Sequence, residues 1–127
     1  MPLVRKTCDE DPVDPNERSP ALHLRYKDLA VLHQLVQSGA DLSKSRHVIY
    51  YSHAPSEETA HAMRREAETK GYEATVQKPL PNFPGQWAMI CETRAVTTPD
   101  FVRESDDFFQ GLADRHTAEY DGWEAST

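Results

Sequence analysis

The order of helical and strand patterns is the feature that most restricts the fold of this chain. Some segments repeat apolar residues every three to four positions, as helices do, while others alternate them or group them in short β-branched runs, as strands do. In chain order these segments are helix 22–38, strand 46–53, helix 57–70, strands 72–77 and 87–92, helix 99–113 and strand 118–123. After the first helix the order is βαββαβ. It predicts an α+β fold, a two-layer ferredoxin-like sandwich with an antiparallel four-stranded sheet and an extra N-terminal helix.

The clearest helix follows Thr98, which has the residue type of an N-cap, with Pro99 at the first helical position. Its apolar stripe consists of Phe101, Val102, Ser105, Phe108, Phe109, Leu112 and Ala113. We expect this stripe, with the Phe108 ring in it, to carry the core. Asp106 and Asp107 lie on the same helix, and both are expected at the surface because acidic side chains are usually solvated.

The other two helices are predicted from weaker patterns. Ser56 is a plausible N-cap for the second helix, and Gly71 closes it. The apolar face of the first helix is assigned to Leu29, Leu32, Leu35 and Val36.

Residues 1–20 differ in composition from the rest of the chain. They include four prolines, which interrupt helices and strand ladders, and five acidic residues. Their apolar residues are too few to offset the entropy lost on ordering. We therefore expect an acidic, proline-rich and flexible arm over 1–20, and a single ferredoxin-like domain over 21–127.

The net charge of −7 argues against a protein that grips a phosphate backbone, which would show a basic stripe. The sequence has no long apolar run and no secretory signal at its start, so a cytoplasmic protein is expected. Cys8 and Cys91 lie in a predicted arm and a predicted strand, and a structural disulfide is not expected. The oligomeric state is left open.

Signatures of catalysis are missing from the sequence. It has no nucleophile elbow and no phosphate-binding loop, so we expect a protein that is not an enzyme. The six histidines form no helical i, i+4 pair, which makes a surface or interface role more plausible than a metal site. No metal and no cofactor are therefore expected. A metal-dependent enzyme would need these histidines to converge.

The terminal segment combines two large aromatics with an Asp-Gly pair. Gly122 should adopt a positive φ in a tight backbone reversal. Tyr120 and Trp123 are three residues apart, so an extended strand would place one in the core and the other on the surface, unless the Asp-Gly pair between them changes that alternation. Whether either ring serves as core anchor or partner contact is open at this point.

Several segments together resemble the regulator of ribonuclease activity B family, small bacterial proteins that bind and inhibit ribonuclease E. They are Gly39-Ala40-Asp41-Leu42, the strand from Arg46 through Tyr50 to His53, Lys70-Gly71-Tyr72, the strand carrying Trp87, and the ending Tyr120-Asp121-Gly122-Trp123-Glu124. In order, they cover roughly residues 26–124. The resemblance implies the predicted fold and a non-enzymatic protein-binding regulator with ribonuclease E, or a related endonuclease, as its partner.

The family residues that the resemblance carries onto this chain are candidates for partner binding or motif positions: Asp41, Leu42, Arg46, Tyr50, Trp87, Tyr120, Asp121, Gly122, Trp123 and Glu124. Arg46 is expected to pair with a carboxylate near the end of the sheet.

In such a sandwich one sheet face has no helices on it. The first strand offers aromatic or large residues to both faces of the sheet, and an aromatic patch on the uncovered face would be a partner or ligand site. The proline-rich loop or the arm could instead cover that face. The alternative function is a domain that binds a small ligand or peptide on it.

Overall fold

The computed structural model describes residues 14–127, so most of the predicted arm lies outside the described residues. The elements in chain order are α2 (Tyr26–Gln37), β2 (Ser45–Ala54), α3 (Glu57–Thr69), β3 (Glu73–Gln77), β4 (Trp87–Val96), α4 (Pro99–Arg115) and β5 (Glu119–Ala125). This order confirms the predicted succession of helices and strands. The largest difference in strand length is in β4, which continues four residues beyond the predicted end at 92.

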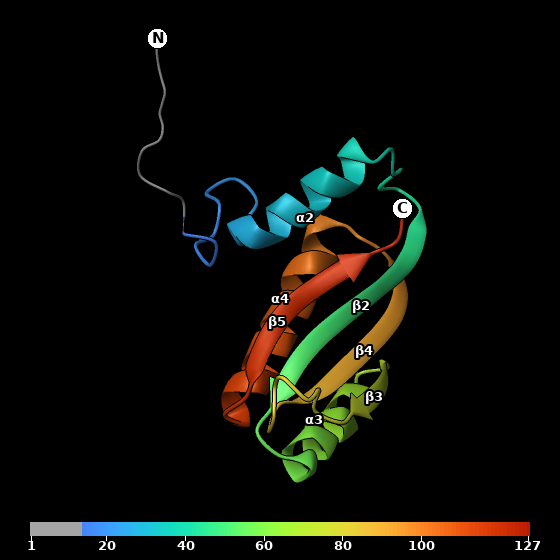
Figure 1. Cartoon of the computed structure of the whole chain (residues 1–127). Helices are drawn as coiled ribbons and strands as arrows, with labels where there is room; N and C mark the ends of the chain where they lie inside the picture. Colours follow the sequence, from blue (N-terminus) through green and yellow to red (C-terminus); the bar gives the residue numbers. More distant parts are fainter. Residues whose placement is uncertain (1–13) are drawn as a thin grey trace.

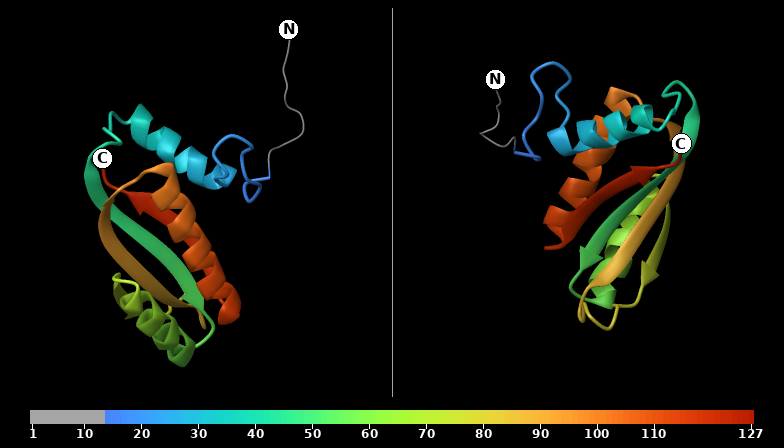
Figure 2. Two further views of the ribbon diagram at one scale, coloured as in Figure 1. Left: turned by 180° about the vertical axis from the view of Figure 1, so that it is seen from behind. Right: turned by 45° about the horizontal axis from the view of Figure 1, so that its top comes forward.

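The four strands form one sheet in the order β3-β4-β2-β5, and each neighbouring pair is antiparallel. Figure 1 looks onto the face of the sheet that the helices leave open, and the view from behind shows α3 and α4 on the other face (Figure 2). Helix α2 lies across the end of α4, near the C-terminal end of β5 (Figure 1). The fold is the predicted ferredoxin-like sandwich with an added N-terminal helix.

Two helix starts follow the predicted capping chemistry. The hydroxyl of Ser56 accepts a hydrogen bond from the backbone N–H of Thr59 at the start of α3. The hydroxyl of Thr98 accepts one from Phe101 at the start of α4, with Pro99 as its first residue. Each cap satisfies a backbone donor that the first helical turn leaves unpaired.

The first helix begins later than predicted, at Tyr26 rather than at residue 22. His23 has a φ of 59°, a left-handed conformation that interrupts a right-handed helix. The backbone N–H of Ser19 donates to the carbonyl of Leu24 at 2.7 Å, and the Leu24 side chain is fully buried. Tertiary burial of Leu24 therefore competes with helix formation over 22–25. Val36 is half exposed, so its assignment to the apolar face of this helix was wrong.

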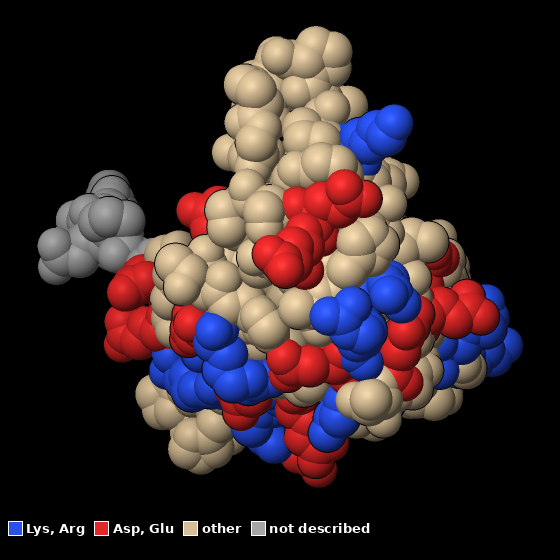
Figure 3. Space-filling model, turned by 90° about the horizontal axis from the view of Figure 1, so that it is seen from below, with Lys and Arg blue, Asp and Glu red and all other residues tan. Residues whose placement is uncertain are grey.

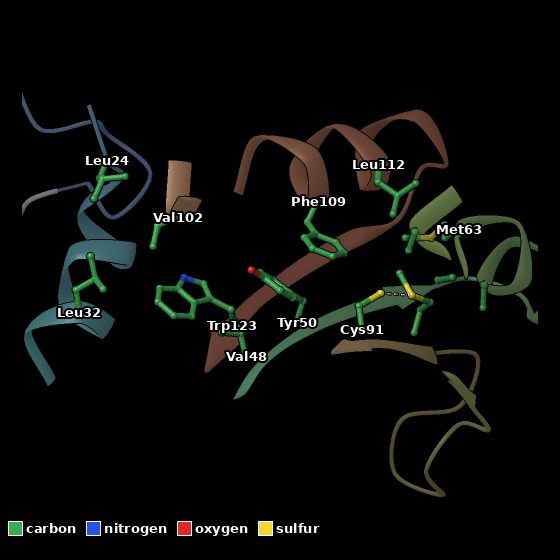
Figure 4. Packing of buried hydrophobic residues seen from close by; sticks show 14 of the residues in the cluster. Leu24, Leu32, Val48, Tyr50, Met63, Cys91, Val102, Phe109, Leu112 and Trp123 are labelled. Atoms are coloured by element: carbon green, nitrogen blue, oxygen red, sulfur yellow. Dashed lines mark hydrogen bonds between the residues drawn. The ribbon is translucent and has the colours of Figure 1, made fainter. Parts of the chain in front are cut away.

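Tyr50 of β2 and Phe109 of α4 form the centre of the core (Figure 4). Their rings are stacked with centroids 4.3 Å apart. Phe109 also contacts the rings of Tyr72, Phe108 and Tyr120. Phe108 is only partly buried, so the predicted stripe is right but its centre is the next residue.

Candidate functional site

The open face of the sheet is formed by alternate residues of its four strands. Those whose side chains face away from the helices are His47, Ile49, Tyr51 and His53 of β2, Ala88, Ile90, Glu92 and Arg94 of β4, Glu73, Thr75 and Gln77 of β3, and Glu119, Asp121 and Glu124 of β5. The strand pairing sets Ile49 opposite Glu92 and Tyr51 opposite Ile90. The centre of the face is therefore apolar and its margins are polar.

This face is less aromatic than the sequence suggested. Tyr50 is buried on the helix side, and Trp87 lies opposite the buried Ala54 and packs against the same core. Tyr51 is the one aromatic side chain that the described strands place on the open face. The described strands therefore form no aromatic patch on this face, because strand alternation turns Tyr50 to the helix side and the register turns Trp87 there as well.

The charge of the open face is strongly negative. Within the described strands it has five carboxylates, from Glu73, Glu92, Glu119, Asp121 and Glu124, against the single guanidinium of Arg94. A surface of this kind attracts a partner with basic groups.

Short polar contacts organise the carboxylates of this face. The Tyr51 hydroxyl donates to Glu124 at 2.6 Å, and this hydrogen bond, more than burial, raises the pKa of Tyr51 to about 12. A nitrogen of His47 lies 2.7 Å from Glu92, and one of His53 lies 3.5 Å from Asp121. Three of the five acids, Glu92, Asp121 and Glu124, are therefore each contacted by a side chain of β2.

The terminal motif is positioned by a β-bulge. Tyr120 pairs with Ser52 and Gly122 pairs with Tyr51, so Asp121 is an extra residue in the ladder. Gly122 has the predicted positive φ, 115°, but the chain continues as a strand and does not reverse. The extra residue brings positions three apart onto one face, so Tyr120 and Trp123 both point to the helix side. The expected division of the two rings between core and surface was wrong.

Trp123 is an anchor between the sheet and α2. It is 9% exposed, and its indole N–H donates to the carboxylate of Asp28 at 2.9 Å. The Tyr120 ring stacks on Phe109, with the Lys27 ammonium 5.0 Å from its centroid. Asp121 and Glu124 are exposed on the opposite side of the strand. The aromatic members of the motif therefore hold the fold, and its acidic members are exposed to solvent.

Three other motif residues lie near the start of β2. Arg46 is buried and donates to the backbone carbonyls of Asp41 and Ser126, which ties the segment before β2 to the segment after β5. The expected carboxylate partner of Arg46 was wrong. The Asp41 carboxylate instead accepts from the hydroxyl and backbone N–H of Ser43, which lowers its pKa, and Leu42 packs against the core.

A buried cluster of charged side chains joins α2 to α4. Asp28 and Asp106 are almost fully buried, and Asp106 pairs with Arg25 and, at 4.0 Å, with Lys27. The expected exposure of Asp106 was wrong, whereas Asp107 is exposed as predicted and pairs with Arg18. Sequence reasoning missed Asp28 entirely. No local pattern distinguishes a buried acid from a solvated one, because the burial arises where two helices meet.

Asp28 should make stability depend on pH. Burial, followed by the nearby charge of Asp106, raises its pKa from 3.8 to about 6. The folded state then holds the proton more tightly than the unfolded state. The stabilisation is complete below about pH 4 and is lost as the pH rises through about 6, a change on the order of 2–3 kcal/mol. In the variant Asp28→Asn the amide still accepts from Trp123 but does not ionise.

Denaturant unfolding of both proteins at pH 4 and pH 7 measures this effect. We expect the free energy of unfolding of the wild type to fall relative to that of Asp28→Asn as the pH rises, so that the variant is the more stable protein at pH 7. Parallel pH profiles for the two proteins would show that Asp28 titrates normally.

Within residues 14–127 no group of three or more His, Cys, Asp or Glu side chains converges as metal ligands would. Cys91 is buried in β4 as a free thiol, and Cys8 lies outside the described residues. None of the helices in this part of the chain has the length and hydrophobicity that a bilayer crossing requires.

The elements and the open face define a class of protein, a ferredoxin-like α+β sandwich with an added N-terminal helix and one uncovered, acidic sheet face. The family model described as regulator of ribonuclease activity B matches residues 26–125, from the first residue of α2 to the last residue of β5. The chain therefore belongs to the regulator of ribonuclease activity B family, as its motifs indicated. A search of curated proteins found no match.

Proposed function

We propose that this protein is a non-enzymatic regulator that binds ribonuclease E, or a related endonuclease, and inhibits it. The family is named for the regulation of ribonuclease activity, which supports the class of target. The observation that carries the mode of action is the open sheet face, with its apolar centre around Ile49, Tyr51 and Ile90 and its margin of carboxylates. An apolar centre with a polar rim is the usual composition of a protein interface.

The geometry also supports a division of roles among the family residues. Tyr50, Tyr120 and Trp123 keep the sheet and helices packed, and Gly122 permits the bulge. The bulge then presents the Asp121 carboxylate beyond the strand. The acidic motif residues, rather than the aromatic ones, are therefore the proposed contacts with the ribonuclease.

Cleavage of a defined RNA by purified ribonuclease E, with increasing amounts of this protein, tests the proposal. We expect the wild type to inhibit. The variant Glu73→Lys/Glu124→Lys changes two exposed acids of the open face, and Glu58→Lys/Glu104→Lys makes the same charge change on the helices of the other side. Only the first pair should weaken inhibition, by at least about tenfold, because replacing two acids by lysines reverses the charge that attracts a basic partner.

Two results would contradict the proposal in different ways. If the wild type does not inhibit, the regulatory function itself is wrong. If the two double variants weaken inhibition equally, the net charge of the protein rather than the open face is responsible. Circular dichroism of each variant verifies that the fold is retained.

The protein should not bind RNA by itself at physiological salt. Its net charge is −7, and Figure 3, a view of one side, shows basic and acidic side chains interspersed without a basic stripe. Few counterions would be released from the phosphates, so the main contribution to non-specific affinity is missing. Fluorescence anisotropy with a labelled single-stranded RNA measures this, and micromolar affinity in the absence of any ribonuclease would argue against inhibition through protein binding alone.

A further inference from the structure

A hollow of about 440 Å³ lies at one end of the open face, beside the β3–β4 loop. The sheet contributes His53, Ala88 and Glu119 to its walls, and the loop contributes Leu80 and Phe83. The loop, residues 78–86, stands at the lower end of the sheet in Figure 1. The hollow is therefore continuous with the proposed interface, and only the end of that face is overhung by the loop.

The loop exposes two large apolar side chains beside this hollow. Leu80 is 62% exposed and Phe83 is 50% exposed, although neither contributes to the buried core. Three prolines in the loop restrict its backbone, and the N–H of Phe83 donates to the carbonyl of Leu80 at 2.9 Å. A stiff loop loses little conformational entropy on binding, so apolar groups held on it are well suited to contact a partner.

The opposite wall of the hollow is acidic. Glu119 and Asp121 are both exposed there, and His53 lies 3.5 Å from the Asp121 carboxylate. Lys78 is the one Lys or Arg in the lining, and it is also the only charged residue of the loop. The hollow thus combines an apolar wall with a wall that attracts cations.

We infer that this hollow is the docking site for a segment of the partner protein that places an Arg or Lys next to an aliphatic or aromatic side chain. The cation meets Glu119 and Asp121, and the apolar side chain packs on Leu80 and Phe83. This inference rests on the proposed function, because it specifies which part of the open face anchors the ribonuclease and what chemistry the ribonuclease must supply. The carboxylates of the neighbouring strands extend the same attraction along the sheet.

The chemistry can be tested without any ribonuclease, by NMR titration of the isotopically labelled full chain. The probes are the peptides acetyl-Arg-Leu-Arg-Leu-amide and acetyl-Glu-Leu-Glu-Leu-amide, with arginine amide and a short oligouridylate as further arms. The basic peptide should shift the amide signals of Gln77, Gln86, Ala88 and Glu119, which surround the hollow. The acidic peptide should leave them unchanged.

Each of the other results would overturn the inference. If both peptides cause equal shifts, the hollow does not require a basic group in its ligand. If arginine amide alone causes shifts equal to those of the basic peptide, the hollow does not require an apolar side chain. If the shifts lie elsewhere on the chain, the hollow is not the binding site. Shifts of the same amides with oligouridylate would assign the hollow to RNA rather than to a protein segment.

The same site is tested in the ribonuclease assay with two matched pairs of variants. Leu80→Ser/Phe83→Ser removes the exposed apolar pair, and Leu22→Ser/Val36→Ser removes two exposed apolar side chains far from the hollow in sequence. Asp121→Asn removes one acid of the hollow, and Glu58→Gln removes one from α3. The hollow variants should weaken inhibition at least about tenfold, with melting temperatures close to that of the wild type, and the controls should not.

Inhibition by the wild type that survives in both hollow variants would overturn the docking site while leaving the proposed function intact. An inactive wild type would instead overturn the proposed function, and the peptide titration would then decide the chemistry of the hollow by itself.

Discussion

Trp123→Ala is expected to lower the free energy of unfolding by at least about 3–5 kcal/mol, the usual cost of truncating a buried tryptophan. The ring fills the space between β5, α2 and the start of α4, where Leu32 and Val102 also lie (Figure 4). Its loss also removes the hydrogen bond to Asp28, whose second carboxylate oxygen already has no partner. An unpaired buried acid adds a further penalty.

Trp123→Phe is the matched control because it keeps a six-membered aromatic ring and removes the N–H donor together with the rest of the five-membered ring. We expect this variant to lose about 1–3 kcal/mol, as for a buried polar group left unsatisfied. Equilibrium denaturation in urea measures both variants, with the m-value verifying a two-state transition. If Trp123→Ala is nearly as stable as the wild type but inhibits ribonuclease E poorly, Trp123 is a partner contact and its placement between sheet and helix is wrong.

Phe109→Ala should cost about 3–5 kcal/mol as well, because the ring is fully buried and contacts Tyr50, Tyr72 and Tyr120. Aromatic pairs at these separations contribute beyond the area that they bury. The neighbouring Phe108→Ala should cost only about 1 kcal/mol, since its ring is partly exposed and packs on Tyr72 at the edge of the core. Thermal and urea unfolding of the two variants measure the difference.

The comparison of these adjacent residues is informative because their chemistry is identical. If Phe108→Ala is the more destabilising change, α4 is rotated about its axis relative to the arrangement described above. Phe109→Leu serves as a control for volume, and it should recover most of the stability because it leaves a smaller cavity.

Local chemistry was the predictable part of the structure. Ser56 and Thr98 cap the helices as their residue types indicate, and Gly122 has the positive φ that its type permits. The βαββαβ order followed from hydrophobic periodicity. Few ways of connecting these strands and helices into one sheet are compatible with that order, and the observed topology is one of them. Such features depend on residues close together in sequence, so a linear pattern contains them.

The candidate site was less predictable, because its composition depends on strand register. Tyr50 and Tyr51 are neighbours in sequence, yet only the β2–β4 pairing determines which of them faces the helices. The bulge at Asp121 then reverses the expectation for Tyr120 and Trp123 by adding one residue to the ladder. A single-residue change in register moves every following side chain to the other face, and the Asp-Gly pair was the local sign that the alternation could change here.

The sequence by itself determined the family, the fold class and the acidic balance of this protein, because each depends on the identity and order of residues. Only the tertiary structure decided which acids are buried with Asp28 and Asp106, and which stand on the open face with Glu124. It also brought the apolar loop around Phe83 beside the carboxylate of Asp121. Burial and the meeting of distant segments are set by the packing of helices on the sheet, and this packing gives acids of the same type opposite roles.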